Sequence, residues 1–145
     1  IGLTNEVLGG LRGLTGMHCC GNTDWSVLMA TDIDILNFDA YNYGEALALY
    51  TDELKAFLDR GGVLAWGIVP SDEAVLAGET APELLKRLDD LISLLAGKGI
   101  SYDILLKQCL ITPSCGLATL SPAAAVRALS LTAEVSKGFR DLHNT

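Results

Sequence analysis

A short stretch of this 145-residue chain, residues 16–25 (GMHCCGNTDW), holds one of its two histidines and two of its four cysteines. His18 and Cys20 are two residues apart in a segment, 13–20, whose composition predicts a short strand. Side chains two apart in a strand lie on the same face, so an imidazole and a thiol are presented together, whereas Cys19 points to the opposite face. The stretch is a candidate metal site, with a redox pair or core packing as the alternatives.

Two further residues of ligand type follow other predicted strands. Asp39 ends the second predicted strand, and Cys115 lies in TPSCG just past the fourth. In a β/α barrel, functional groups lie at the C-terminal ends of the strands, where these residues and His18 fall. One nitrogen, two sulfurs and one oxygen suit a borderline-soft, four-coordinate ion such as zinc, so the predicted ligands are His18, Cys20, Cys115 and Asp39. The alternative for each is structural: a buried cysteine, a hydrogen-bonded histidine or a helix-capping aspartate.

The elements that must position these residues alternate regularly along the chain. Strands are predicted at 13–20, 33–39, 62–69 and 108–112, and helices at 23–31, at 44–59, from TAPE at 80–83 and from Ser121 and Pro122 onward. The run 62–69 is continuously apolar, which is typical of a strand buried on both faces of a parallel sheet. This alternation predicts an α/β fold with parallel strands and crossover helices.

Apolar residues at helical spacing predict which side of each helix is buried. The predicted stripes are Leu47, Tyr50, Leu54 and Phe57 in the second helix, Leu84, Leu88, Leu91 and Leu95 in the third, and Val126, Leu129 and Ala133 in the last. We expect each stripe to face the core.

Two residues around the end of the third predicted strand are candidates for a substrate pocket. Trp66 lies within LAWGIV, and Asp72 follows the strand. The alternatives are barrel packing for Trp66 and a solvated loop charge for Asp72.

Four βα units are few for a complete fold of this class, because doubly wound sheets usually have five or six strands and a closed barrel has eight. We therefore expect residues 1–145 to be a single unit, the C-terminal half of a (β/α)8 barrel of the TIM type, and a fragment of a longer chain. An open half-barrel exposes two sheet edges and its inner face. We expect the missing half-barrel, or a second copy of the chain, to cover them.

The composition excludes several classes of partner. The formal net charge of −8 argues against binding to nucleic acid or to an anionic membrane surface. The longest nearly apolar run, residues 61–69, is far too short to span a bilayer. Four cysteines are too sparse for a disulfide scaffold, which favours reduced or metal-bound thiols and a cytoplasmic location.

Four segments together resemble a known superfamily: MHCCGNTDW, DIDILNFDAY, LAWGIVPSDE and TPSCGL. They are similar to the C-terminal half of the barrel shared by cobalamin-independent methionine synthases, uroporphyrinogen decarboxylases and methylcobamide:coenzyme M methyltransferases. The resemblance covers nearly the whole chain and is closest to the methionine-synthase-like zinc methyltransferases. It implies a zinc site of H-x-C and a distant cysteine, matched by His18, Cys20 and Cys115. Asp39 falls where the synthases carry glutamate, and the decarboxylases lack this zinc set.

The resemblance also implies an activity. A methyltransferase of this kind passes a methyl group from a methylfolate or a methylcorrinoid to a zinc-bound thiol, here expected to be homocysteine, in methionine synthesis. Its partners would be a small-molecule thiol and the methyl donor, which can be carried on a corrinoid protein. The alternatives are coenzyme M as the acceptor, a non-catalytic zinc-binding module that partners a corrinoid protein, and a purely structural half-barrel.

Overall fold

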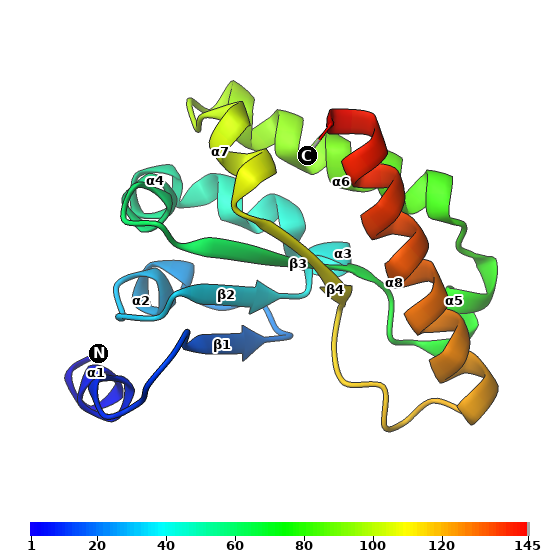
Figure 1. The fold of residues 1–145 in the computed structure, drawn as a ribbon, viewed down its shortest axis with the longest axis horizontal. Coiled ribbons are helices and arrows are strands. Elements are labelled where there is room, and N and C mark those ends of the chain that lie inside the picture. The colour runs from blue at the N-terminus through cyan, green and yellow to red at the C-terminus, as the bar shows by residue number, and fades with distance from the viewer. Residues whose placement is uncertain (145) are drawn as a thin grey trace.

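The computed structural model describes residues 1–144 and contains one four-stranded sheet (Figure 1). The strands are β1 (Gly16–Cys19), β2 (Ile35–Phe38), β3 (Val63–Val69) and β4 (Cys109–Pro113). All three pairings are parallel, and the order across the sheet is β1-β2-β3-β4. The prediction of an α/β fold with four parallel strands is confirmed, and the strand order lacks the reversal of a doubly wound sheet.

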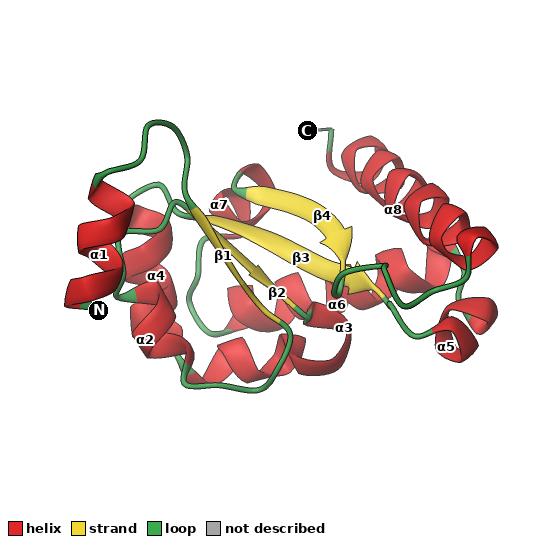
Figure 2. Ribbon diagram, turned by 90° about the horizontal axis from the view of Figure 1, so that it is seen from below, coloured by secondary structure: helices red, strands yellow, loops and turns green. Residues whose placement is uncertain are grey.

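Helices connect the strands and cover one face of the sheet. They are α1 (Gly2–Gly9), α2 (Trp25–Met29), α3 (Ala40–Tyr43), the 3₁₀-helix η1 (Gly44–Leu49), α4 (Thr51–Asp59), α5 (Glu73–Gly78), α6 (Ala81–Gly97), α7 (Tyr102–Lys107) and α8 (Pro122–His143). Figure 2 shows α2, α3, α4 and α6 along one side of the strands, with α1 and α8 at opposite ends of the sheet. Within residues 1–144, no helix combines the length and apolar character that crossing a membrane requires.

The helices differ from the predicted ones in number and extent. The single helix expected at 44–59 is divided into η1 and α4, because Tyr50 between them leaves the helical conformation (φ −120°, ψ 45°). Helices α1, α3, α5 and α7 were not predicted. Three of these four begin at a side-chain cap, since Asp39 accepts from the amide of Asn42, Asp72 from that of Val75 and Ser101 from that of Ile104. The caps were the available signal for α3, α5 and α7.

The core lies between the sheet and its helices and is rich in aromatic rings. Trp66 is fully buried, and its ring centroid lies 5.2 Å from that of Phe38, which in turn lies 5.8 Å from Trp25. The structure therefore places Trp66 in the core, the packing alternative, and not in an open pocket. Asp72 is exposed and caps α5.

The predicted stripe of α6 is confirmed and that of α8 is wrong. Leu84, Leu88, Leu91 and Leu95 of α6 are all buried. In α8 the buried residues are Ala128, Leu131, Val135 and Phe139, whereas Val126 and Leu129 are 65% and 58% exposed. The sequence of α8 has apolar residues on two sides, and only one of those sides faces this core.

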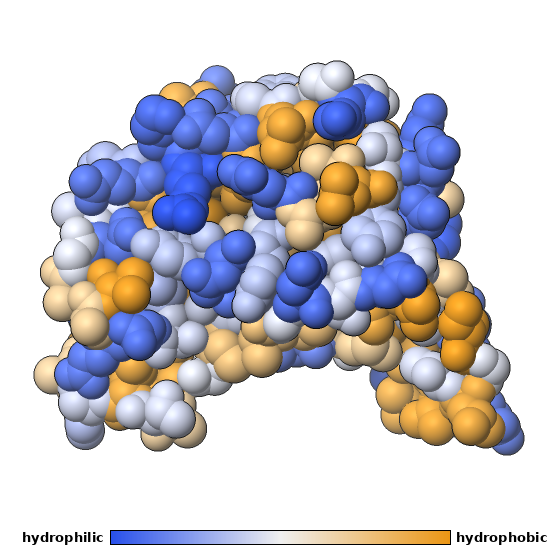
Figure 3. All heavy atoms as spheres, turned by 180° about the vertical axis from the view of Figure 1, so that it is seen from behind, coloured by the Kyte–Doolittle hydropathy of each residue, from blue (hydrophilic) through white to orange (hydrophobic). Residues whose placement is uncertain are grey.

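Both ends of the molecule carry exposed apolar side chains. Leu3 and Val7 of α1 are 82% and 68% exposed, and Val126 and Leu129 lie near the start of α8. Seen from behind, the surface has the outline of an arch with apolar atoms gathered on both feet (Figure 3). One foot is α1, and the other is the loop before α8 with the start of that helix. Exposed apolar surface of this kind is typical of an interface.

A carboxylate clamp sets the start of β1 against that of β2. Asp34 accepts hydrogen bonds from the amide and the hydroxyl of Thr15, at 2.7 and 3.0 Å. The amide of Asp34 donates back to the Thr15 carbonyl at 2.9 Å. The Thr15 donors hold the pKa of the Asp34 carboxyl below its ordinary value. This clamp fixes the register in which His18 of β1 meets β2.

We expect Trp66→Ala to lower the free energy of unfolding by about 3–5 kcal/mol, because it leaves a large cavity in the core. Urea denaturation followed by circular dichroism measures the change. The control is Leu49→Ala, at a side chain that is 82% exposed, where the change should stay within about 0.5 kcal/mol. A loss below about 1 kcal/mol for Trp66→Ala would contradict its place in the core.

We expect the Asp34 clamp to make stability depend on acid pH. A carboxyl whose folded pKa is depressed contributes stability that is present above its unfolded pKa, near 3.8, and that is lost as the pH falls through the folded value. Wild-type protein should therefore lose more unfolding free energy between about pH 5 and about pH 3 than Asp34→Asn does. Denaturation at both pH values measures this, with Asp52→Asn, at an exposed carboxylate of α4, as the control. Equal pH dependence in wild type and Asp34→Asn would refute the clamp.

Candidate metal centre

Three of the four predicted ligands meet at one rim of the sheet. His18 lies in β1, Cys20 directly follows that strand, and Cys115 is two residues past the end of β4. One ligand atom from each, an imidazole nitrogen and two sulfurs, all lie within 4.8 Å of one another. The side chains of His18 and Cys20 are exposed and Cys115 is half-buried, so the group is open to solvent.

The closeness of the two cysteines is unusual for their place in the sheet, because β1 and β4 are its two edge strands. Neighbouring strands lie about 4.8 Å apart, so strands three positions apart in a flat sheet are separated by about 14 Å. The curvature of the sheet and the path of the chain after β4 bring Cys115 back toward β1.

Hydrogen bonds at Ser114 hold the chain next to Cys115. The Ser114 amide donates to the Val69 carbonyl at 2.8 Å, and its hydroxyl lies 3.1 Å from the Ser71 amide and 3.0 Å from the Ser71 hydroxyl. Ser114 is 2% exposed. Gly67 permits this approach, since a Cβ atom there would lie 2.8 Å from the Ser114 Cα. The loop carrying Cys115 is therefore tied to the end of β3.

Asp39, the fourth predicted ligand, lies outside the group of three. Its carboxylate is the N-cap of α3 and accepts from the Asn42 amide at 2.9 Å and from the Asn42 side chain at 2.7 Å. It is 5% exposed. In this structure Asp39 therefore caps a helix, which was the alternative to metal binding.

The two sulfurs of the group influence one another. The hydrogen bond and charge of the neighbouring Cys115 raise the pKa of the Cys20 thiol, because two adjacent thiolates repel. A dication between the sulfurs would remove that repulsion and favour both thiolates. Cys109 differs, since burial in the core raises the pKa of its thiol to about 12. Cys109 is half-buried and packs against the core, away from the group of three.

The donor set and its spacing fit zinc. Zinc binds sulfur at about 2.3 Å and nitrogen at about 2.0–2.1 Å in tetrahedral sites, which places neighbouring donors about 3.3–3.8 Å apart. A group within 4.8 Å needs only a small closure to reach this spacing. Three protein ligands leave one position for another molecule, the arrangement of catalytic rather than structural zinc sites.

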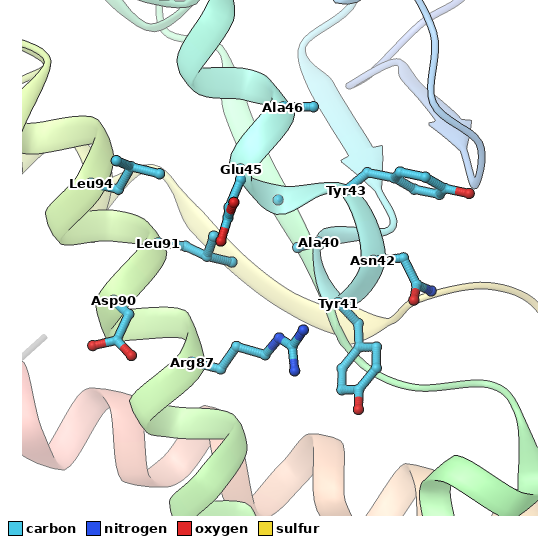
Figure 4. Close-up of a pocket in the computed structure, with 11 residues that line it drawn as sticks. Ala40, Tyr41, Asn42, Tyr43, Glu45, Ala46, Arg87, Asp90, Leu91 and Leu94 are labelled. Atoms are coloured by element: carbon cyan, nitrogen blue, oxygen red, sulfur yellow. The ribbon is translucent and has the colours of Figure 1, made fainter.

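A separate pocket of about 610 Å³ lies among α3, η1 and α6, and none of the three ligands lines it (Figure 4). Two of its polar side chains, Arg87 and Tyr41, already have interaction partners. The Arg87 guanidinium lies 4.2 Å from the centre of the Tyr41 ring, and the Tyr41 hydroxyl donates to Glu79. This pocket is distinct from the metal centre.

Comparison of the chain with protein-family models, with curated proteins and with solved structures found no match.

We expect zinc to protect Cys20 and Cys115 from alkylation by iodoacetamide, because the metal occupies the sulfur lone pairs. Mass spectrometry of peptides from metal-free and zinc-loaded protein measures labelling at each cysteine. Cys109 is the internal control and should react slowly in both samples, since little of its thiol is ionised near pH 8 when its pKa is about 12. Labelling of Cys20 that zinc leaves unchanged would argue against the site.

Proposed function

We propose that this chain is the zinc-bearing part of a methyltransferase that delivers a methyl group to the sulfur of a small-molecule thiol, with homocysteine as the acceptor and methionine as the product. The observation that carries the proposal is the convergence of His18, Cys20 and Cys115 within 4.8 Å, from opposite edges of the sheet. The resemblance of the surrounding segments to zinc methyltransferases supports the same activity.

The three residues suit this chemistry in kind and charge. Bound zinc supplies a Lewis acid that lowers the pKa of a thiol in its open position. Cys20 and Cys115 would hold the ion as thiolates, whose two negative charges match the charge of a dication. Sulfur ligands would also donate electron density, so that the acceptor sulfur would keep the nucleophilicity that methyl transfer requires. His18 would be the third ligand, through an imidazole nitrogen.

The step balances without an external oxidant. The acceptor sulfur uses a lone pair to form the S–CH3 bond, and its thiol proton passes to solvent. With a methylcorrinoid donor, the Co–CH3 bond breaks and both its electrons remain on cobalt. With a methylfolate donor, the N–CH3 bond breaks and the nitrogen takes a proton. Nothing in this step changes the oxidation state of zinc.

Net charge favours homocysteine over coenzyme M as the acceptor. The chain has a formal net charge of −8. A charge of this sign disfavours the sulfonate anion of coenzyme M relative to homocysteine, whose ammonium and carboxylate groups cancel.

We further propose that the sheet is half of a (β/α)8 barrel. Its strand order is sequential, its helices cover one face, and the edges β1 and β4 have no neighbouring strand within residues 1–144. The exposed apolar residues of α1 and α8 flank those edges. A second half-barrel, from the same protein or from a second copy of this chain, would cover them.

A non-catalytic zinc module is the second candidate function. Exposure of His18 and Cys20 favours it, because an acceptor bound there would be open to water unless another half-barrel covered the site. Such a module would hold zinc and present it to a corrinoid protein without transferring the methyl group itself.

We expect residues 1–145 to bind one zinc ion and, when joined to the half-barrel that completes the sheet, to transfer methyl groups from methylcobalamin to homocysteine. Zinc stoichiometry is measured by chelator competition, and transfer by the loss of methylcobalamin absorbance. Cys20→Ala should weaken zinc binding and slow transfer by about 100-fold or more, because it removes a ligand. Cys109→Ala is the matched control and should change neither.

Each negative result has a distinct meaning. Zinc binding by the complete barrel without methyl transfer to homocysteine or coenzyme M would favour the non-catalytic module. Failure to bind zinc at micromolar concentration would overturn the metal site and leave a structural role.

A further inference from the structure

We infer that Asn37 is a positioning residue that fixes the tautomer of His18, so that Nε2 is the nitrogen offered to the metal. The inference rests on the proposed function, because that function makes His18 a metal ligand. The observation behind it is the set of hydrogen bonds that Asn37 makes. Asn37 lies in the middle of β2, opposite His18 of β1 on one side and Ala65 of β3 on the other. All three belong to the face of the sheet opposite the helices.

The orientation of the Asn37 amide is determined by its partners on β3 and β4. Its nitrogen Nδ2 lies 3.0 Å from the Ala65 carbonyl oxygen and 2.8 Å from the Thr112 hydroxyl. An amide nitrogen carries two hydrogens and accepts none, so these two acceptors use both donors. The backbone carbonyl can only accept, which excludes the flipped amide at that position. The oxygen Oδ1 must therefore face His18.

The position of Oδ1 determines which nitrogen of the His18 imidazole carries the hydrogen. Asn37 Oδ1 lies 2.5 Å from His18 Nδ1. An amide oxygen can only accept a hydrogen bond, so Nδ1 must carry the hydrogen. In a neutral imidazole the other nitrogen, Nε2, then has the free lone pair that a metal ion requires. Asn37 thus selects the metal-binding form of Nε2 before any metal arrives.

Small residues on β3 leave room for this arrangement. Asn37 reaches from β2 across β3 to Thr112 on β4, a path that passes Ala65 and Gly67, which are in register with Asn37 and Thr112. At Gly67 a Cβ atom would overlap the Phe38 carbonyl oxygen and lie 2.8 Å from the Ser114 Cα, so the backbone beside this path leaves no room for a side chain there. His18, Asn37 and Thr112 therefore form a polar line across the open face, from one edge strand to the other.

This line links the two strands that supply the ligands. His18 is on β1, and Thr112 is on β4, three residues before Cys115. Hydrogen-bonded partners of ligating histidines are typically worth 10–100-fold in metal affinity, because they fix the ring orientation and its tautomer. We assign that role to Asn37, with Thr112 holding the amide in place.

The experiment compares Asn37→Leu, which removes the acceptor at nearly constant volume, with Asn37→Asp, which keeps an oxygen facing Nδ1. Long-range 15N–1H correlation spectra of metal-free protein near pH 8 report which imidazole nitrogen carries hydrogen. His143, the only other histidine, is the internal reference. Wild type and Asn37→Asp should show His18 protonated at Nδ1, whereas Asn37→Leu should shift it toward the Nε2-protonated form.

Zinc affinity is then measured on the same three proteins by chelator competition. Asn37→Leu should weaken binding by about 10–100-fold, and Asn37→Asp should restore most of it. A wild-type His18 protonated mainly at Nε2, or a tautomer that Asn37→Leu leaves unchanged, would overturn the inference. So would a tautomer shift without a change in zinc affinity. Because the tautomer is read without metal, absence of zinc binding in wild type would count against the proposed function and not against the assignment of Asn37 to the tautomer.

Discussion

The convergence of His18, Cys20 and Cys115 depends on the curvature of the sheet, because these residues come from strands at opposite edges. A flat four-stranded sheet would hold Cys20 and Cys115 about 14 Å apart. In this structure the ligand atoms lie within 4.8 Å, and the chain after β4 is drawn over the end of β3 by Ser114. Gly67 has no side chain to obstruct that path. Gly67 therefore helps to place Cys115 without contacting the group of three, because it lets the chain at Ser114 pass close to β3.

The two faces of the sheet carry different kinds of interaction. On the helix side, the rings of Phe38 and Trp66 pack at a tilt of 56° within a fully buried aromatic cluster. On the open side, His18 and Asn37 are joined by hydrogen bonds that continue to β4. Strand alternation produces this division, since neighbouring residues point to opposite faces. The core supplies rigidity from one side, and the polar line positions the imidazole from the other.

Local patterns were sufficient to predict the four strands and three side chains that the structure brings together, those of His18, Cys20 and Cys115. The spacing of His18 and Cys20 and the place of Cys115 after the last strand are short-range features of the sequence. The α8 stripe was misassigned because apolar residues on two sides of a helix do not reveal which side meets the core, and Val126 and Leu129 lie on the exposed one. Asp39 was assigned to the metal, although its position before a helix equally suited a cap. Asn37 was not singled out from the sequence, although a polar amide inside an otherwise apolar strand is visible there. Its role depends on the hydrogen bond to Thr112, 75 residues away along the chain, which only the structure reveals.

The separation of Cys20 and Cys115 along the chain gives the centre a thermodynamic consequence. An ion held by both closes a loop that contains most of the polypeptide, and an unfolded chain cannot hold the two sulfurs and the imidazole together without a large loss of entropy. A metal ion bound to this group would therefore stabilise the folded chain in proportion to the logarithm of the ratio of its free concentration to its dissociation constant. The population of folded molecules would then rise and fall with the supply of that metal.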